Sequence, residues 1–84
     1  MTPTQLGLAR HALGLPNRQR QSYRNHYRCP DGEQHLDRLE WKQMSAEALA
    51  YSSGDGFYHL TSKGAGAAIE PNERLDPEDF EEIT

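Results

Sequence analysis

The strongest constraint on the fold is an amino-terminal helix whose two ends are both marked in the sequence. Thr2 suits the N-cap position, and Gln5 stands three residues later, where a capping box requires it. At the other end, Gly14 can adopt the left-handed conformation that stops a helix, and Pro16 prevents its continuation. The sequence therefore predicts a helix from about residue 3 to residue 13.

The length and composition of the chain set the size of its core. With 84 residues, of which 35% are apolar, the chain can form one domain that buries only a small core. This apolar fraction lies below the average for globular domains but above the range of disordered chains. We therefore expect a single compact domain over residues 1–70, followed by a flexible acidic tail, residues 71–84.

The cysteine content and hydropathy indicate the compartment. Cys29 is the single cysteine, whereas a small secreted domain normally contains several disulfides. The amino terminus has no signal sequence, and no apolar run approaches the roughly 20 residues of a membrane span. We expect a soluble cytoplasmic protein that uses no membrane, no cofactor and no small-molecule substrate.

Charge is distributed very unevenly along the chain. The net charge is −4, but residues 1–30 contain five arginines and no acid, which gives them a charge of +5. Residues 70–84 have a charge of −6, and residues 31–69 have a charge of −3. Such asymmetry indicates electrostatic contacts with a partner.

The middle of the chain predicts three further elements. A turn at residues 30–32 precedes a helix over about 33–46, and a β-hairpin with a glycine-rich tip follows over 51–60. Thr61 can cap a last helix that runs through Ile69. Together these elements predict an α+β fold, in which two or three helices pack on a small antiparallel sheet.

Two segments remain open at this stage. Residues 17–29 have no clear period, and a short helix, an ordered loop and an extended segment are all compatible with them. A short acidic helix could begin at Asp76 in the tail. The apolar pattern of the whole chain gives these core candidates: Leu6, Leu8, Ala9, Leu13, Leu36, Leu39, Trp41, Met44, Leu49, Phe57, Leu60 and Ile69.

The main candidate binding site is a basic segment, residues 18–28, in which arginines alternate with aromatic and polar side chains. Arginine offers forked donors to phosphate or carboxylate groups, and tyrosine can stack while still donating a hydrogen bond. This composition is typical of contacts with nucleic acid or with an acidic protein. The alternative is that the tyrosines are core residues and the arginines are ordinary solvated charges. The candidate site residues are Arg18, Arg20, Tyr23, Arg24, Asn25, His26 and Arg28.

Metal binding and catalysis have much weaker support. His26, Cys29, Asp31 and His35 include one thiol and no cysteine pair, whereas structural zinc sites usually show two close ligand pairs. A nucleophile at Cys29 would need an orienting group and an oxyanion site in a cleft, for which a small domain has little room. We therefore expect a binding protein and no enzymatic activity.

The acidic tail has three interpretations. It can be a solvated and disordered end, which is the commonest case. It can fold back on the basic amino-terminal half of the chain. It can also mimic the phosphates of nucleic acid toward a basic partner.

Part of the chain resembles the winged-helix group. A helix is followed by a hairpin that closes in Phe57-Tyr58-His59-Leu60-Thr61-x-x-Gly64, and the resemblance covers about residues 33–69. In that group the helix before the wing enters the major groove of DNA. This chain departs from the pattern because the corresponding helix contains the acids Asp37, Glu40 and Glu47 against only two bases, Arg38 and Lys42.

A second resemblance is to short phage- and prophage-encoded proteins of unknown function. It rests on the stretches Arg10-His11-Ala12-Leu13-Gly14-Leu15 and Tyr23-Arg24-Asn25-His26-Tyr27, and on the stretch from Phe57 to Gly64. The resemblance implies an accessory protein that acts in a bacterial host cytoplasm. It carries over no functional residues.

We therefore expect a phage-type accessory protein that binds a host or phage protein, for example as an inhibitor of host defence. The alternative is a winged-helix-like DNA-binding regulator that uses the basic segment. A continuous basic face would favour DNA, whereas a basic patch covered by acids would favour a protein partner. The sequence leaves the oligomeric state open.

Overall fold

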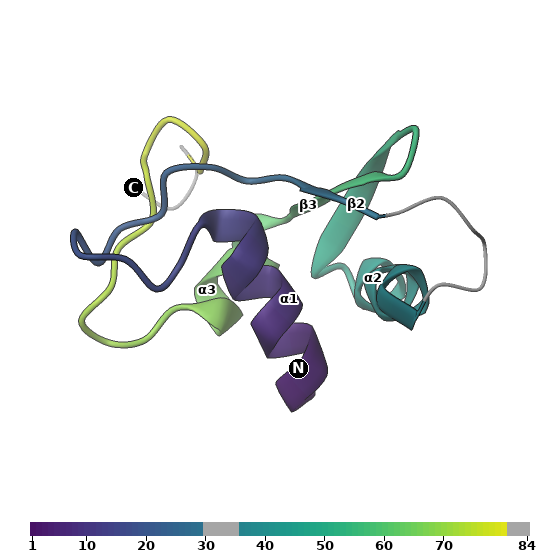
Figure 1. Ribbon diagram of the computed structural model, residues 1–84, viewed down its shortest axis with the longest axis horizontal. Coiled ribbons are helices and arrows are strands. Elements are labelled where there is room, and N and C mark those ends of the chain that lie inside the picture. The colour runs from purple at the N-terminus through teal and green to yellow at the C-terminus, as the bar shows by residue number, and fades with distance from the viewer. Residues whose placement is uncertain (30–35, 81–84) are drawn as a thin grey trace.

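The computed structural model describes residues 1–29 and 36–80, which form three helices and one three-stranded antiparallel sheet. This arrangement confirms the predicted α+β class. The predicted turn at 30–32 and the first residues of the predicted helix 33–46 lie outside the described residues. None of the described helices has the length and apolar composition needed to span a membrane. In chain order the elements are α1 (Pro3–Leu13), β1 (Tyr27–Arg28), α2 (Leu36–Ala46), β2 (Ala50–Gly54), β3 (Phe57–Leu60) and α3 (Ser62–Ala68) (Figure 1).

The caps of α1 agree with the prediction from sequence. The Thr2 hydroxyl accepts a hydrogen bond from the Gln5 backbone N–H, and the Gln5 side chain accepts one from the Thr2 backbone N–H, both at 3.1 Å. Gly14 ends the helix with φ of 80°, a left-handed conformation that glycine adopts without a steric penalty. Local sequence therefore determines both ends of this helix.

The sheet has the strand order β1-β3-β2, with β3 in the centre. Along β3, Tyr58 and Leu60 are buried, while Phe57 and His59 are half-buried. The expectation that Phe57 is a core residue is therefore wrong, and Tyr58 takes that place. Since side chains alternate across a strand, Phe57 and Leu60 lie on opposite faces of the sheet and cannot both point into the core.

The core lies where α1, α2 and α3 meet the sheet. Trp41 and Met44 of α2 are fully buried, as are Ala9 and Leu13 of α1. Three predicted core residues are instead exposed to solvent. Leu36 and Leu39 lie on the side of α2 away from Trp41 and Met44, whereas Leu6 lies on the same face of α1 as Ala9 but one turn nearer the amino end. Their exposed fractions are 37% for Leu6, 75% for Leu36 and 50% for Leu39.

A glycine allows α3 to pack closely against the chain that precedes β2. Thr61 caps the helix, as predicted, and accepts a hydrogen bond from the Gly64 N–H at 3.1 Å. A Cβ atom at Gly64 would lie 1.9 Å from the carbonyl oxygen of Leu49, so no larger residue fits there. Gly66, on the same helix, has no atom within 4 Å of its Cβ position.

The described part of the acidic tail belongs to the compact domain, which corrects the predicted boundary at residue 70. Phe80 is only 2% exposed and is part of the core cluster. Arg74 pairs in a parallel bridge with Gln21, and its N–H donates to the carbonyl oxygen of Arg20 at 2.8 Å. Residues 77–79 form a turn, and no helix begins at Asp76 within the described residues. The small core explains this packing, because the domain needs the apolar surface that Phe80 supplies.

Candidate basic binding surface

The basic segment begins in a turn at residues 18–19 and then runs to β1 along one side of the molecule (Figure 1). Tyr23 N–H donates to the carbonyl oxygen of Leu13, and His26 N–H donates to that of Ala12, both at 3.2 Å. The last carbonyl groups of a helix have no partner within the helix. The segment satisfies two of them, which explains why these residues form neither a helix nor a free loop.

Two of the predicted site residues are committed to structural hydrogen bonds. The Asn25 side chain accepts from the Leu60 N–H at 2.8 Å and donates to the Leu60 carbonyl oxygen at 3.0 Å. Asn25 therefore joins the segment to β3. The Arg24 guanidinium donates to the His11 carbonyl oxygen at 2.7 and 3.2 Å.

The other predicted residues are open to solvent. Tyr23 is 62% exposed, and the Arg24 guanidinium lies 5.3 Å from the centre of its ring. Arg28 lies on β1 with its guanidinium 5.8 Å from the centre of the Phe57 ring. Arg18, Arg20 and Arg28 form no ion pair with any residue in the ranges 1–29 and 36–80. The exposed members of the predicted site are Arg18, Arg20, Tyr23, His26 and Arg28.

Arg10, the arginine of residues 1–29 that lies outside the predicted site, has a buried partner that the sequence did not indicate. Its guanidinium donates to both carboxylate oxygens of Glu73, at 2.5 and 2.7 Å, and to the carbonyl oxygen of Ala68 at 3.0 Å. The hydrogen bond from Arg10 lowers the pKa of Glu73 below its ordinary value of 4.5. This pair fastens the acidic tail to α1 and removes one arginine from the exposed basic surface.

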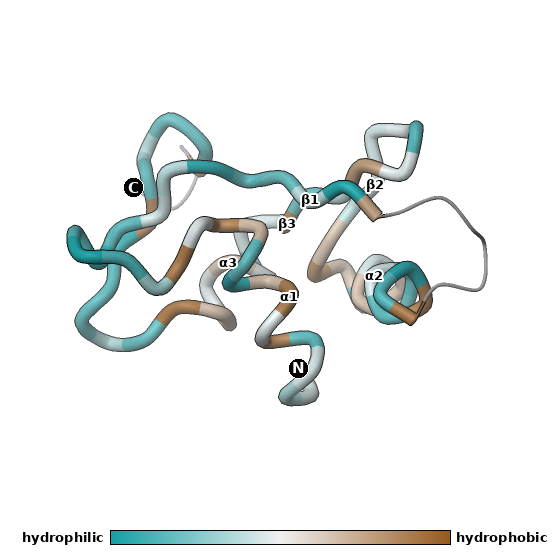
Figure 2. The backbone as a smooth tube through the Cα atoms, viewed as in Figure 1, coloured by the Kyte–Doolittle hydropathy of each residue, from teal (hydrophilic) through white to brown (hydrophobic). Residues whose placement is uncertain are grey.

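Acids of the tail lie beside the middle of the basic segment. The Asp76 N–H donates to the Ser22 hydroxyl at 2.8 Å. Burial, followed by the charge of Asp76, raises the pKa of Asp79, while nearby His26 lowers it. Arg18 and Arg20 therefore lie on one side of these carboxylates in the chain path, and Arg28 lies on the other. The hydropathy colouring of the backbone shows that this part of the chain is mostly hydrophilic (Figure 2).

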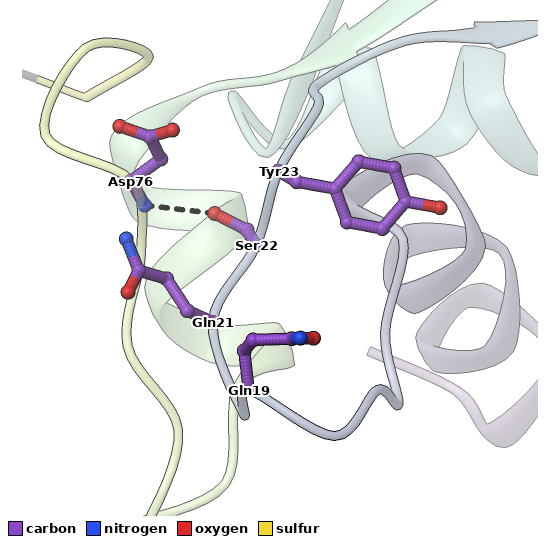
Figure 3. A pocket seen from close by; sticks show the side chains of 5 residues that line it. All are labelled: Gln19, Gln21, Ser22, Tyr23 and Asp76. Atoms are coloured by element: carbon purple, nitrogen blue, oxygen red, sulfur yellow. Dashed lines mark hydrogen bonds between the residues drawn. The ribbon is translucent and has the colours of Figure 1, made fainter.

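A pocket of about 300 Å³ opens where the basic segment meets the tail (Figure 3). The Ser22 hydroxyl and the Asp76 backbone join its two sides through the hydrogen bond described above. Most of its polar atoms belong to residues that the sequence did not single out, since glutamine and serine have no distinctive spacing here. The lining residues are Gln19, Gln21, Ser22, Tyr23 and Asp76.

Cys29 has the environment of a structural residue. Its side chain is 1% exposed, and its N–H donates to the carbonyl oxygen of Gly56 at 2.9 Å. Burial raises the pKa of the thiol, so it remains protonated at neutral pH and is a poor nucleophile and metal ligand. Among the described residues no three metal-binding side chains lie close together, and Asp31 and His35 fall outside those residues.

No family model, curated protein or solved structure matches this chain. The two resemblances noted in the sequence therefore remain expectations. The contacts and charges of the basic segment and the tail are the basis for a functional proposal.

Proposed function

We propose that this protein is a small, non-catalytic binding protein, of the kind a phage encodes as an accessory, whose basic segment contacts an acidic surface on another protein. The observation that carries the proposal is the position of Asp76 and Asp79 beside Ser22 and His26. These acids lie beside the middle of the basic segment, which in chain order separates Arg18 and Arg20 from Arg28. The basic surface is therefore a mosaic of charges and not a continuous face.

A surface on which basic and acidic side chains alternate suits a protein partner better than duplex DNA. DNA presents one negative charge per about 1.7 Å of helix axis, so carboxylates in the middle of a contact would lie close to phosphates. A protein surface can place an acid opposite each arginine and a donor opposite each carboxylate. Tyr23 supports the same proposal, since exposed tyrosine and arginine side chains are enriched at the centres of protein interfaces.

Binding to DNA is the second candidate, and the exposed Arg18, Arg20 and Arg28 favour it. A winged-helix-like protein would also present α2, the helix before the hairpin, to the major groove. The exposed side chains of α2 include Leu36 and Leu39, which cannot bind phosphate groups, and their one base is Lys42. We therefore rank DNA binding below protein binding.

The proposal can be tested by capture of partners from a bacterial lysate with the tagged full-length protein. We expect a protein partner whose affinity falls about five- to tenfold in either of the variants Arg18→Gln and Arg28→Gln. This is the size of the loss in affinity expected when an arginine that contributes to a protein interface is substituted. Lys63→Gln is the matched control, because it removes one exposed positive charge from α3. Equal loss of binding in all three variants would show a general charge effect and would contradict the proposed surface.

A mobility-shift assay with duplex and single-stranded DNA distinguishes the second candidate. Binding at about 50 mM salt that weakens steeply by about 200 mM would support a DNA contact, since neutralised phosphates release counterions. The absence of a shift at the lower salt concentration would exclude it.

A further inference from the structure

The side of α2 that faces away from the core has the pattern of a short coiled-coil seam. Leu36 and Leu39 are strongly exposed although they are apolar, and Gln43 and Ala46 continue the same line at spacings of four and three residues. These four positions correspond to a, d, a and d of a heptad repeat. Figure 2 shows apolar colouring at the amino-terminal end of α2.

The buried residues of α2 confirm that this line points outward. Trp41 and Met44, which pack into the core, occupy the f and b positions of the same heptad. All the a and d positions are exposed, so the seam lies on the side opposite the core. The helix thus has two apolar faces, of which the domain itself covers one.

The charges that flank the seam indicate what could cover it. Lys42 occupies a g position, and Glu47, one residue past the end of α2, stands at the e position five residues later; both are exposed. The Glu47 N–H still donates to the Gln43 carbonyl oxygen at 3.2 Å, which continues the helical spacing to this residue. In two parallel helices, a g residue of one chain contacts the e residue of the next heptad in the other chain. Lys42 of each copy would therefore face Glu47 of the other. An antiparallel pair would instead bring equal charges together.

We propose that the outer face of α2 binds a second copy of this chain, in a parallel helix pair across a two-fold axis. Each copy supplies both charges, so the two-fold pair contains two Lys42–Glu47 contacts. Gln43, at a central a position, is a polar residue of the type that fixes the register of such a seam.

The association is weak and depends on concentration. With 11 residues, α2 extends over only about 16 Å. Such a contact buries well below the roughly 800 Å² per partner of a standard interface. This surface is separate from the basic segment, so failure of the dimer proposal would leave the proposed function untouched.

Sedimentation equilibrium of the full-length protein tests the proposal. Between about 10 µM and about 1 mM, a range that spans weak dissociation constants, we expect the average mass to rise from that of a monomer toward that of a dimer. Lys42→Glu and Glu47→Lys should each remain monomeric, because each change creates two like-charge contacts in the seam. Lys63→Glu, with the same change in charge on α3, should associate like the wild type.

An equimolar mixture of the two monomeric variants gives the decisive result. Each cross-chain contact in the mixed pair again joins opposite charges, so the mixture should regain the association that each variant lacks. The proposal is overturned if the wild type stays monomeric up to about 1 mM, if either seam variant associates like the wild type, or if the mixture shows no recovery.

Discussion

At the scale of single residues, the Arg10–Glu73 ion pair links the acidic tail to α1. Both carboxylate oxygens are used, and the two side chains are largely buried. A buried charge that loses its partner remains desolvated and unpaired, and breaking such a pair typically costs about 3–5 kcal/mol. The pair joins residues that are 63 positions apart, so it fixes the tail against α1.

The first prediction is that Glu73→Gln lowers the free energy of unfolding by about 3–5 kcal/mol at pH 7, because it leaves the Arg10 guanidinium without its counter-charge. Urea denaturation followed by circular dichroism measures the change. Glu78→Gln removes the same charge from an exposed position and should change the stability by less than about 0.5 kcal/mol. Equal effects of the two variants would contradict the buried pair.

The same pair predicts a loss of stability in acid. The pKa of Glu73 is lower in the folded than in the unfolded chain, so the unfolded chain takes up this proton first as the pH falls. The contribution of Glu73 is therefore complete above its ordinary value of 4.5 and disappears as the pH falls through its folded pKa. The pKa of Asp79 is raised, so this residue changes the free energy of unfolding in the opposite direction as the pH falls. The pH dependence due to Glu73 is therefore best measured in the variant Asp79→Asn. A constant unfolding free energy between pH 6 and pH 3 in that variant would refute the prediction.

At the scale of elements, α3 and β3 each contain two residues of similar type, of which one packs against the rest of the domain more closely than the other. Substitutions at the two positions therefore distinguish the effect of tertiary packing from that of helix or strand propensity. In α3, Gly64 touches the backbone of Leu49, whereas Gly66 faces open space. In β3, Tyr58 is buried, whereas its neighbour Phe57 is half-buried. Within each pair the residues are similar in kind, and the tertiary contact is what differs.

The second prediction concerns the two glycines. Gly66→Ala should stabilise the protein by about 0.4–1 kcal/mol, because alanine has the higher helix propensity and reduces the entropy of the unfolded chain. Gly64→Ala should destabilise it, because the added Cβ would overlap the Leu49 carbonyl group and force α3 away from it. The melting temperatures of both variants measure these effects. Similar melting temperatures would contradict the close contact between Gly64 and the Leu49 carbonyl group.

The third prediction concerns the two aromatic residues of β3. Tyr58→Ala should cost about 3–5 kcal/mol, the usual effect of removing a large buried aromatic side chain. Its ring stacks on that of Trp41 with 5.6 Å between the centres, so the loss also disturbs α2. Phe57→Ala should cost clearly less, since its ring is only half-buried. Chemical denaturation of both variants should give this order, and the reverse order would mean that β3 presents its other face to the core.

At the scale of the whole molecule, the acidic tail completes the domain. Phe80 fills part of the core, Glu73 pairs with Arg10, and Arg74 bridges to Gln21. The tail also places Asp76 and Asp79 beside the basic segment. Stability and the proposed choice of partner therefore depend on the same ten or so residues.

The fourth prediction is that truncation after Glu70 destabilises the domain, whereas the sequence predicted that the core would survive without the tail. Phe80→Ala should cost about 3–5 kcal/mol, and the truncation should cost more, because it also leaves Arg10 unpaired. Circular dichroism and thermal melting of both variants measure these effects. A truncated chain with the melting temperature of the full-length protein would show that the tail only rests on the surface.

The sequence by itself determined the elements whose signals lie within a few residues of one another. The capping box of Thr2 and Gln5, the glycine stop at Gly14 and the cap at Thr61 act through contacts three or four positions away. The glycine-rich tip of the hairpin is equally local. These contacts form in any fold that contains the segment, so their residues predict them directly.

For the candidate site, the sequence indicated the arginines and Tyr23 but not their environment. Asn25 looked available for binding, yet its side chain joins the backbone of β3, 35 positions away. The pairing of Arg10 with Glu73 was equally hidden, because several acids of the tail have the same charge and similar spacing. Only the tertiary structure selects among such partners.

The tertiary structure also decided which apolar side chains entered the core. Helix α2 offers Leu36 and Leu39 on one face and Trp41 and Met44 on the other, and the helical period permits either face to be buried. The sheet contacts Trp41 and Met44, so the leucines remain at the surface. Phe80 enters the core for a similar reason: a chain of 84 residues has few large apolar side chains, and the space left by the helices and the sheet determines which of them is buried.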